Sequence, residues 1–243
     1  MAKFGKWIGG GLGWAFGGPI GGMLGFVIGS VIDGVSSAGQ YPAETQQGQT
    51  TTGGYIMSLL VLVAAVMKAD GKVMKSELNY VKNFLVHNFG EESASEAIAM
   101  LRDLLNQTIP VNDVCQQIER NMNYPSRLQL LHFLFGIALS DGTVDKNELD
   151  LIQHISITMG ISAGEFESIK AMFIRDTKAD YTILEIEPTA TDDEVKQAYR
   201  TMAKKYHPDM VSYLGEDFQI AAKEKFQKVN EAYENIKKER KMV

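Results

Sequence analysis

Apolar residues recur at helical spacing through most of the chain between Tyr55 and about Arg175, without the alternation that is typical of strands. Segment 55–70 is apolar on every side over about a dozen residues, which is too short to span a bilayer and typical of a helix at the centre of a bundle. Further helices are predicted at 76–89, 91–107, 110–122, 124–141, 147–160 and 162–176. The pattern therefore predicts an all-α bundle over residues 55–176.

Two longer helical patterns follow Lys178. The first begins at Thr191, which opens a Thr-Asp-Asp-Glu capping box, and the second runs from Phe218 to Lys237. Between them, His207-Pro208-Asp209 ends the first helix, because proline cannot continue it and forces the preceding residue out of the helical conformation. We predict an antiparallel helix hairpin whose corner exposes an imidazole and a carboxylate.

The first helix of this hairpin carries basic residues on the face opposite its apolar side. We call this set the basic stripe; it consists of Lys196, Arg200, Lys204 and Lys205. Like charges four residues apart repel and weaken a helix by a few tenths of a kcal/mol per pair. A solvated face is the simple interpretation, whereas a stripe kept at this cost favours docking to an acidic partner.

Glycines spaced four residues apart dominate the N-terminal segment 1–33, and no charged residue occurs from Trp7 to Ile32. As a helix, these 26 residues would extend roughly 39 Å, compared with about 30 Å for the hydrocarbon core of a bilayer. The glycines would share one face and let another backbone approach, which favours membrane association and self-association. They are Gly5, Gly9, Gly13, Gly17, Gly21, Gly25 and Gly29.

This glycine ladder leaves alternatives open. A flexible tail and a cleaved signal peptide are the competing interpretations, and Pro19 is compatible with either a kinked span or a hairpin in the membrane. Lys3 and Lys6 favour a cytoplasmic N-terminus, so a single span would carry the rest of the chain across, whereas a hairpin would return it. Residues 34–54 are polar and rich in Ser, Thr, Gln and Gly, which predicts a flexible linker.

Composition excludes several function classes. The formal net charge of −6 argues against nucleic-acid binding, which requires a basic surface. Cys115 is the single cysteine, so no intramolecular disulfide forms, which fits a reducing compartment. The sequence contains no nucleophile elbow, phosphate-binding loop or dinucleotide fingerprint. We therefore expect a protein that is not itself an enzyme.

An internal repeat links the two halves of the bundle: ADGKVMKSEL at 69–78 matches SDGTVDKNEL at 140–149. Helix capping explains the second copy, in which Gly142 stops one helix and Asp145 begins the next, but Met74 replaces the capping aspartate in the first copy. The alternative is a divalent-cation site, because carboxylate oxygens suit calcium or magnesium. Its candidate ligands are Asp70, Glu77, Asp141 and Glu148.

Two known families are similar to these segments. The paired D-G-x-V-x-x-x-E-L turns within about 120 helical residues resemble the TerB-like tellurite-resistance domain, in which acidic residues have been proposed to hold metal. The segments YTILEI, TDDEVKQAYRTMAKKYHPD and KFQKVNEAYE look like a J-domain, the module of DnaJ-type co-chaperones. Glu185 departs from the glycine usual after the first short helix, and Met210 from a common lysine. Those departures bear on affinity for a partner more than on activity.

The order of a membrane-like N-terminus, a TerB-like bundle (55–176) and a J-domain (178–243) resembles the DjlA-type DnaJ-like proteins. This resemblance implies that His207, Pro208 and Asp209 engage a DnaK-type chaperone and trigger its ATP hydrolysis, with the basic stripe docking on that partner. We expect a membrane-associated co-chaperone whose J-domain faces the cytoplasm; a cytoplasmic protein is the alternative. The alternative function is a TerB-like stress-response or cation-binding scaffold with the J-domain as its output.

Overall fold

A computed structural model of the 243-residue chain describes residues 18–20, 52–142, 145–174, 178–214 and 216–242. Within these ranges every regular element is a helix, as the sequence pattern predicts. The predicted glycine face (Gly9, Gly13, Gly17, Gly21, Gly25 and Gly29), nearly all of the linker and Val144 lie outside the described residues. Among the described helices, none is both long and apolar enough to cross a membrane.

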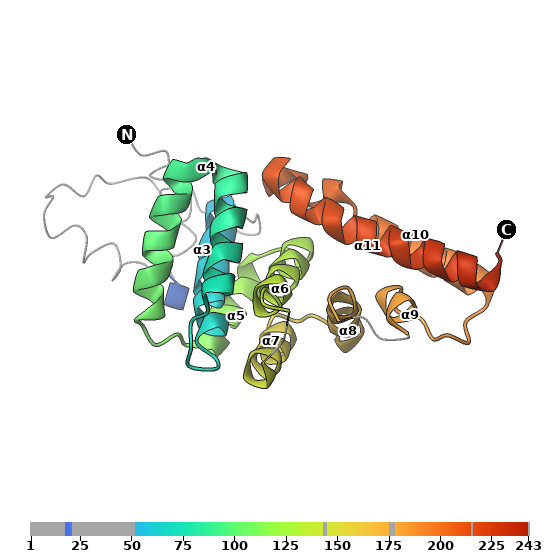
Figure 1. The fold of residues 1–243 in the computed structure, drawn as a ribbon, viewed down its shortest axis with the longest axis horizontal. Helices are drawn as coiled ribbons and strands as arrows, with labels where there is room; N and C mark the ends of the chain where they lie inside the picture. The colour runs from blue at the N-terminus through green and yellow to red at the C-terminus, as the bar shows by residue number, and fades with distance from the viewer. Residues whose placement is uncertain (1–17, 21–51, 143–144, 175–177, 215, 243) are drawn as a thin grey trace, which may run out of the picture.

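Helix α3 (Thr52–Met67) is the centre of the bundle (Figure 1). It packs against α4 (Lys75–Leu105), α5 (Val111–Asn121), α6 (Tyr124–Ala138) and α7 (Lys146–Thr158). Every side chain from Tyr55 to Met67 is buried, which explains why this helix is apolar on all sides. Helix α8 (Ala163–Ala171) follows α7 and leads toward the C-terminal part.

Gly90 divides α4 into the two helices that the sequence predicts. Its backbone has φ 77° and ψ 166°, a conformation outside the helical region that glycine adopts without a steric penalty. The chain therefore reverses direction there, and α4 forms two neighbouring arms beside α3 (Figure 1). This bend lets one continuous stretch of helix cover two sides of the central helix.

The C-terminal hairpin, residues 178–242, consists of α9 (Ala179–Ile183), α10 (Asp192–Lys205), the 3₁₀ helix η1 (Pro208–Leu214) and α11 (Glu216–Arg240). Helices α10 and α11 pack side by side, with the rings of Tyr199 and Tyr233 stacked 4.2 Å apart. The Tyr199 hydroxyl donates to Asn230 Oδ1 at 3.0 Å. The predicted two-helix hairpin is therefore present, and α9 packs against α8 and α11.

The short described piece of the N-terminal segment, Gly18–Ile20, contacts the bundle. The backbone N–H of Ile20 donates to Gln117 Oε1 of α5 at 3.1 Å, and the Ile20 side chain is fully buried. A Cβ on Gly18 would lie only 2.4 Å from the same Gln117 oxygen. A side chain at this position would therefore require the end of the Gln117 side chain to shift.

Candidate functional site

Local sequence fixes where α10 begins and ends. Its first turn is held by a reciprocal capping box: the Glu194 N–H donates to Thr191 Oγ1 at 3.3 Å, and the Thr191 N–H donates to Glu194 Oε2 at 2.7 Å. At the other end, the Tyr206 N–H donates to Met202 O at 2.9 Å as the last helical bond. Pro208 then starts η1, so the chain turns immediately after the helix.

The turn presents His207 and Asp209 to solvent, with side-chain exposures of 49% and 81%. The Asp209 N–H donates to His207 Nδ1 at 3.3 Å, and that nitrogen lies 3.4 Å from Asp209 Oδ2. The imidazole packs nearly perpendicular to the Phe226 ring, with the ring centroids 5.6 Å apart. We call residues 207–209 the HPD corner. It holds an imidazole and a carboxylate together on an exposed turn, where a partner protein can contact both.

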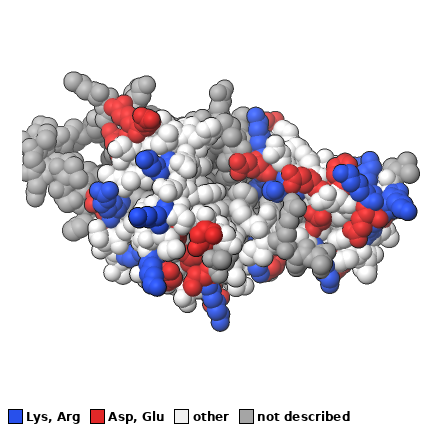
Figure 2. Space-filling view, in the orientation of Figure 1, with Lys and Arg blue, Asp and Glu red and all other residues white. Residues whose placement is uncertain are grey.

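The basic stripe is only partly free. Arg200 and Lys204 are exposed and Lys196 is half-buried. Lys205 differs from the sequence expectation, because it forms ion pairs with Glu165 of α8 and with Glu185, at 2.9 Å for the latter. Along α10 the acidic residues lie only in the first turn, and the tertiary structure supplies Lys205 with two carboxylates from outside the helix. Figure 2 shows another gathering of Lys and Arg at the end nearest the C-terminus, where α11 ends in Lys237, Lys238 and Arg240.

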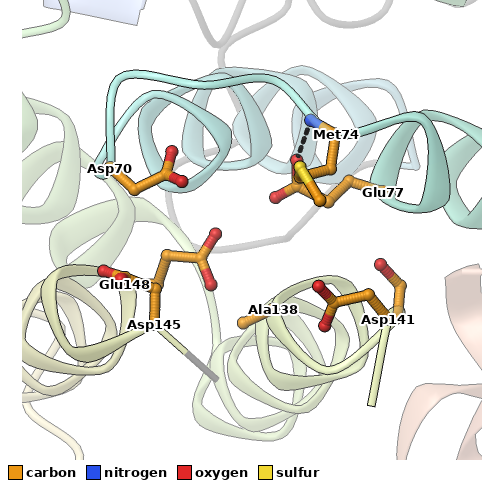
Figure 3. A pocket seen from close by; sticks show the side chains of 8 residues that line it. Asp70, Met74, Glu77, Ala138, Asp141, Asp145 and Glu148 are labelled. Atoms are coloured by element: carbon orange, nitrogen blue, oxygen red, sulfur yellow. Dashed lines mark hydrogen bonds between the residues drawn. The ribbon is translucent and has the colours of Figure 1, made fainter. Parts of the chain in front are cut away.

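The four carboxylates proposed as cation ligands lie together around one pocket, with a cavity of about 290 Å³ (Figure 3). Asp70 lies in the turn between α3 and α4, and Glu77 lies in the first turn of α4. In the same way, Asp141 lies in the turn between α6 and α7, and Glu148 lies in the first turn of α7. The structure thus brings the two copies of the repeat face to face. Asp145 and Ser140 also line the pocket; the sequence marked Asp145 only as a cap.

The capping interpretation of the repeat also finds support. Asp145 Oδ1 accepts from the Asn147 N–H at 2.7 Å, and Gly142 has φ 88°. In the first copy Gly71 has φ 79°, and Glu77 Oε2 accepts from the Met74 N–H at 2.7 Å without a side-chain cap from Met74. Both glycines therefore end their helices in the left-handed conformation, which L-residues with a Cβ rarely adopt.

Two buried carboxyl groups face one another in this pocket. Glu77 and Glu148 are 3% and 6% exposed, and Glu77 Oε1 has no hydrogen-bond partner among the described residues. Burial, followed by the neighbouring Glu77 carboxylate, raises the pKa of Glu148 to about 7. Burial is also the largest cause that raises the pKa of Glu77. At neutral pH the pair therefore retains a proton for part of the time.

As they stand, the described His, Cys, Asp and Glu side chains form no group of three arranged to hold a metal ion. Asp70 is half-buried and Asp141 is exposed at the rim of the turns, whereas Glu77 and Glu148 are buried. A cation in the pocket would require the rim carboxylates to move toward the buried pair. The donor set itself, carboxylate oxygens, is the one that calcium and magnesium prefer.

Three family models match consecutive parts of the chain. They are the tellurite resistance protein TerB over residues 57–171, the DnaJ domain over 180–242 and the co-chaperone DjlA transmembrane domain over 1–47. No solved structure matches the chain.

Curated proteins match over most of the length. The co-chaperone protein DjlA of Vibrio vulnificus is 27% identical over 245 residues, covering 83% of this chain and 82% of that protein. The protein of the same name from Vibrio cholerae is 27% identical over 244 residues, covering 85% and 83%. The chaperone protein DnaJ of Acetobacter pasteurianus is 49% identical over 61 residues, covering 25% of this chain and 15% of that protein. The similarity to DnaJ is therefore local, whereas the similarity to the DjlA proteins extends over most of the chain.

Proposed function

Because the chain belongs to the DjlA-type family of DnaJ-like proteins, with a TerB-like helical domain followed by a C-terminal J-domain, we propose that it recruits a DnaK-type chaperone at a membrane and stimulates its ATP hydrolysis. The observation that supports this proposal most directly is the exposed HPD corner at the end of α10. The C-terminal hairpin of residues 178–242 is from here on called the J-domain.

The mechanism rests on the groups that the J-domain presents. Arg200 and Lys204 extend from α10 into solvent and attract an acidic surface on the chaperone, which raises the encounter rate and sets the orientation. The HPD corner lies at the end of the same helix, so a partner that docks on the stripe also meets His207 and Asp209. The chain contributes no phosphate-binding motif of its own, and it acts as an activator of the partner's active site.

The test is steady-state ATP turnover by a DnaK-type chaperone with the full chain in detergent micelles. The His207→Gln variant removes the imidazole at the corner, and we expect it to lose stimulation. His154→Gln is the matched control, since His154 is also exposed but lies on α7 of the bundle. If His207→Gln stimulates turnover as strongly as the unchanged protein, the proposal is wrong.

The glycine-rich segment is the proposed membrane attachment, in keeping with the DjlA transmembrane-domain match over residues 1–47. The J-domain would face the cytoplasm, where a chaperone loaded with ATP is present. Protease added to intact and to opened cells measures this orientation. The J-domain should be cut only after the cytoplasmic side becomes accessible, and cleavage from the outer side alone would contradict the orientation.

Self-association through the glycine face is a separate part of the proposal. Bulky side chains at Gly13, Gly17 and Gly21 would block close helix contact but keep the segment apolar. Replacing these three glycines with leucine should weaken oligomers in detergent and leave membrane attachment intact. Unchanged oligomers would exclude the glycine face as the contact.

A cation-binding scaffold is the second candidate function, because five carboxylates line the pocket between the repeated turns. Calorimetry with calcium, magnesium and manganese tests it on the full chain. Binding heat should disappear when Asp141→Ala and Glu148→Ala are combined. It should persist in Asp150→Ala, which changes an exposed acid on the same helix α7. The absence of heat from the unchanged protein would exclude this function.

A further inference from the structure

The bundle and the J-domain meet at Lys205, the last residue of α10. Its ammonium group pairs with Glu165 of α8 and with Glu185 Oε1 at 2.9 Å. Glu165 belongs to the bundle, whereas Glu185 belongs to the J-domain. We call these three residues the latch. It connects the two domains directly beside the HPD corner.

Glu165 is held ready for this contact by its own helix cap. It accepts hydrogen bonds from Ser162, whose N–H lies 3.1 Å away, and from the Tyr124 hydroxyl. Burial by itself would raise the pKa of Glu165, but the hydrogen bonds from Lys205, Ser162 and Tyr124 lower it to about 2. The carboxylate is therefore charged over the whole physiological pH range and remains directed at Lys205.

Glu185, the third residue of the latch, has an unfavourable backbone conformation. Its φ is 57°, in the left-handed region where the Cβ of an L-residue is strained. Glycine is usual at this position in J-domains and would relieve that strain. The glutamate instead places a second carboxylate on Lys205. The residue that departs from the family pattern, Glu185, is thus the one that pairs with Lys205 at the end of the basic stripe.

A tight seam continues the contact along α6. Lys225 of α11 is 1% exposed, and its ammonium donates to the backbone carbonyl of Leu128 at 2.7 Å. The same ammonium lies 5.2 Å from the centroid of the Tyr206 ring. Pro125 and Leu128 of α6 face His207 of the HPD corner and Met210 of η1 across a gap of only about 10 Å³. The inner side of the corner is therefore covered by the bundle.

The seam also contains a feature that favours its opening. Burial lowers the pKa of Lys225 well below its ordinary value, and the nearby Lys205 ammonium lowers it further. A buried ammonium that donates to a backbone carbonyl loses more hydration than this hydrogen bond returns. The ion pairs of the latch stabilise the contact between the two domains, whereas the buried Lys225 side chain destabilises it. This balance suits a contact that opens and closes.

We propose that the bundle restrains the J-domain through the latch, and that an acidic chaperone surface opens the latch by taking Lys205 from Glu165. His207 and Asp209 of the HPD corner and Arg200 and Lys204 of the basic stripe are exposed in the closed arrangement. The partner can therefore dock before the latch opens. Full engagement of the chaperone then requires that Lys205 and the inner side of the HPD corner be released from the bundle. This inference rests on the proposed function for its activity readout, and the closed arrangement itself is measurable without the chaperone.

Three variants of the full chain in detergent micelles test the latch. Glu165→Gln removes the bundle's charge but keeps a side chain that serves in a capping box. Lys225→Met keeps the apolar stem and removes the buried ammonium. Glu167→Gln is the matched control, because Glu167 is half-exposed on the same helix and pairs within it with Lys170.

Opposite effects are expected from the first two variants. Glu165→Gln should raise chaperone ATP turnover at subsaturating concentrations by about fivefold, within the usual range for coupled sites. It should also speed hydrogen exchange in residues 179–186 and 206–212. Lys225→Met should lower turnover and slow exchange in the same residues. A misfolded variant could also lower turnover, but its exchange would be faster and not slower. Glu167→Gln should match the unchanged protein in both measurements.

The latch is refuted if Glu165→Gln and Lys225→Met leave exchange in residues 179–186 and 206–212 unchanged, whatever the turnover. It is also refuted if exchange changes as expected but turnover by the stimulated chaperone does not. Failure of the proposed function looks different: the unchanged protein would then give no stimulation, or His207→Gln would stimulate fully. Hydrogen exchange would still report whether the closed arrangement exists.

Discussion

The carboxyl pair of the acidic pocket makes the stability of the bundle depend on pH. Glu148 has a pKa of about 7 in the folded protein, compared with an ordinary value of 4.5. The folded state therefore binds an extra proton at pH values between these two limits. The perturbation that tests this is a change from pH 8 to pH 5, combined with Glu148→Gln, which is neutral at both pH values.

The sign and magnitude follow from proton linkage. An acid whose pKa is raised on folding stabilises the folded state when protonated, so stability rises as pH falls from 8 through 7 toward 4.5. The full difference between the two pKa values corresponds to roughly 3 kcal/mol. The pocket opens to solvent, and pH 5 lies above the ordinary pKa of 4.5. We therefore expect Glu148 to contribute roughly 2 kcal/mol to the free energy of unfolding between pH 8 and pH 5. Glu165, with its pKa of about 2, titrates below this window and does not mask the effect.

Native-state hydrogen exchange of the α3 amides is a suitable assay, because this central helix is protected until the bundle opens. Burial also lowers the pKa of His132, so the unfolded chain takes up a proton there as pH falls and stability is lost. After correction for intrinsic exchange rates, the contribution of Glu148 is therefore the difference in protection between the unchanged protein and the Glu148→Gln variant. The Glu148→Gln variant should be more protected than the unchanged protein at pH 8, and this advantage should shrink toward pH 5. The titrations of Glu77 and His132 remain in both proteins and cancel in the comparison. Glu92→Gln, an exposed site on α4, serves as the control. The reasoning fails if the Glu148→Gln variant keeps the pH dependence of the unchanged protein.

Three further predictions concern packing, capping and docking. Gly136→Ala should destabilise the bundle by about 1–3 kcal/mol in urea denaturation, because a Cβ there would lie 2.1 Å from the Tyr80 hydroxyl oxygen; unchanged stability would mean that Tyr80 moves freely. Thr191→Ala should cost about 1 kcal/mol and speed exchange at the start of α10, since the cap with Glu194 is lost; equal exchange would show that the cap is redundant. Arg200→Glu should weaken chaperone stimulation most at low salt, and a salt-independent loss would argue against electrostatic docking.

Much of the fold follows from local sequence patterns. Apolar spacing determines the helices, and Gly90 marks where α4 reverses because its backbone must leave the helical region. The Thr191–Glu194 capping box and Pro208 define both ends of α10 within one or two residues. The corner at residues 207–209 needed no tertiary information, since a helix end followed by proline turns and is exposed by local chemistry alone.

The sequence could not reveal which distant residues meet. The repeated turns are 71 positions apart, and their separation in space depends on how α3 and α6 pack in the bundle. The shared pocket, and with it the raised pKa of Glu148, therefore appears only in the tertiary structure, because desolvation depends on every surrounding element.

Lys205 illustrates the same division. Its sequence neighbours on α10 identify a basic stripe, which the helical period alone determines. Its partners Glu165 and Glu185 come from another helix and from a turn, and they reach it because the bundle and the J-domain pack against each other. The sequence by itself determined the helices, their ends and the exposed HPD corner, which depend on contacts between near neighbours. Only the tertiary structure decided which charges are paired and which carboxyls hold protons, since ion pairing and desolvation depend on distances in space.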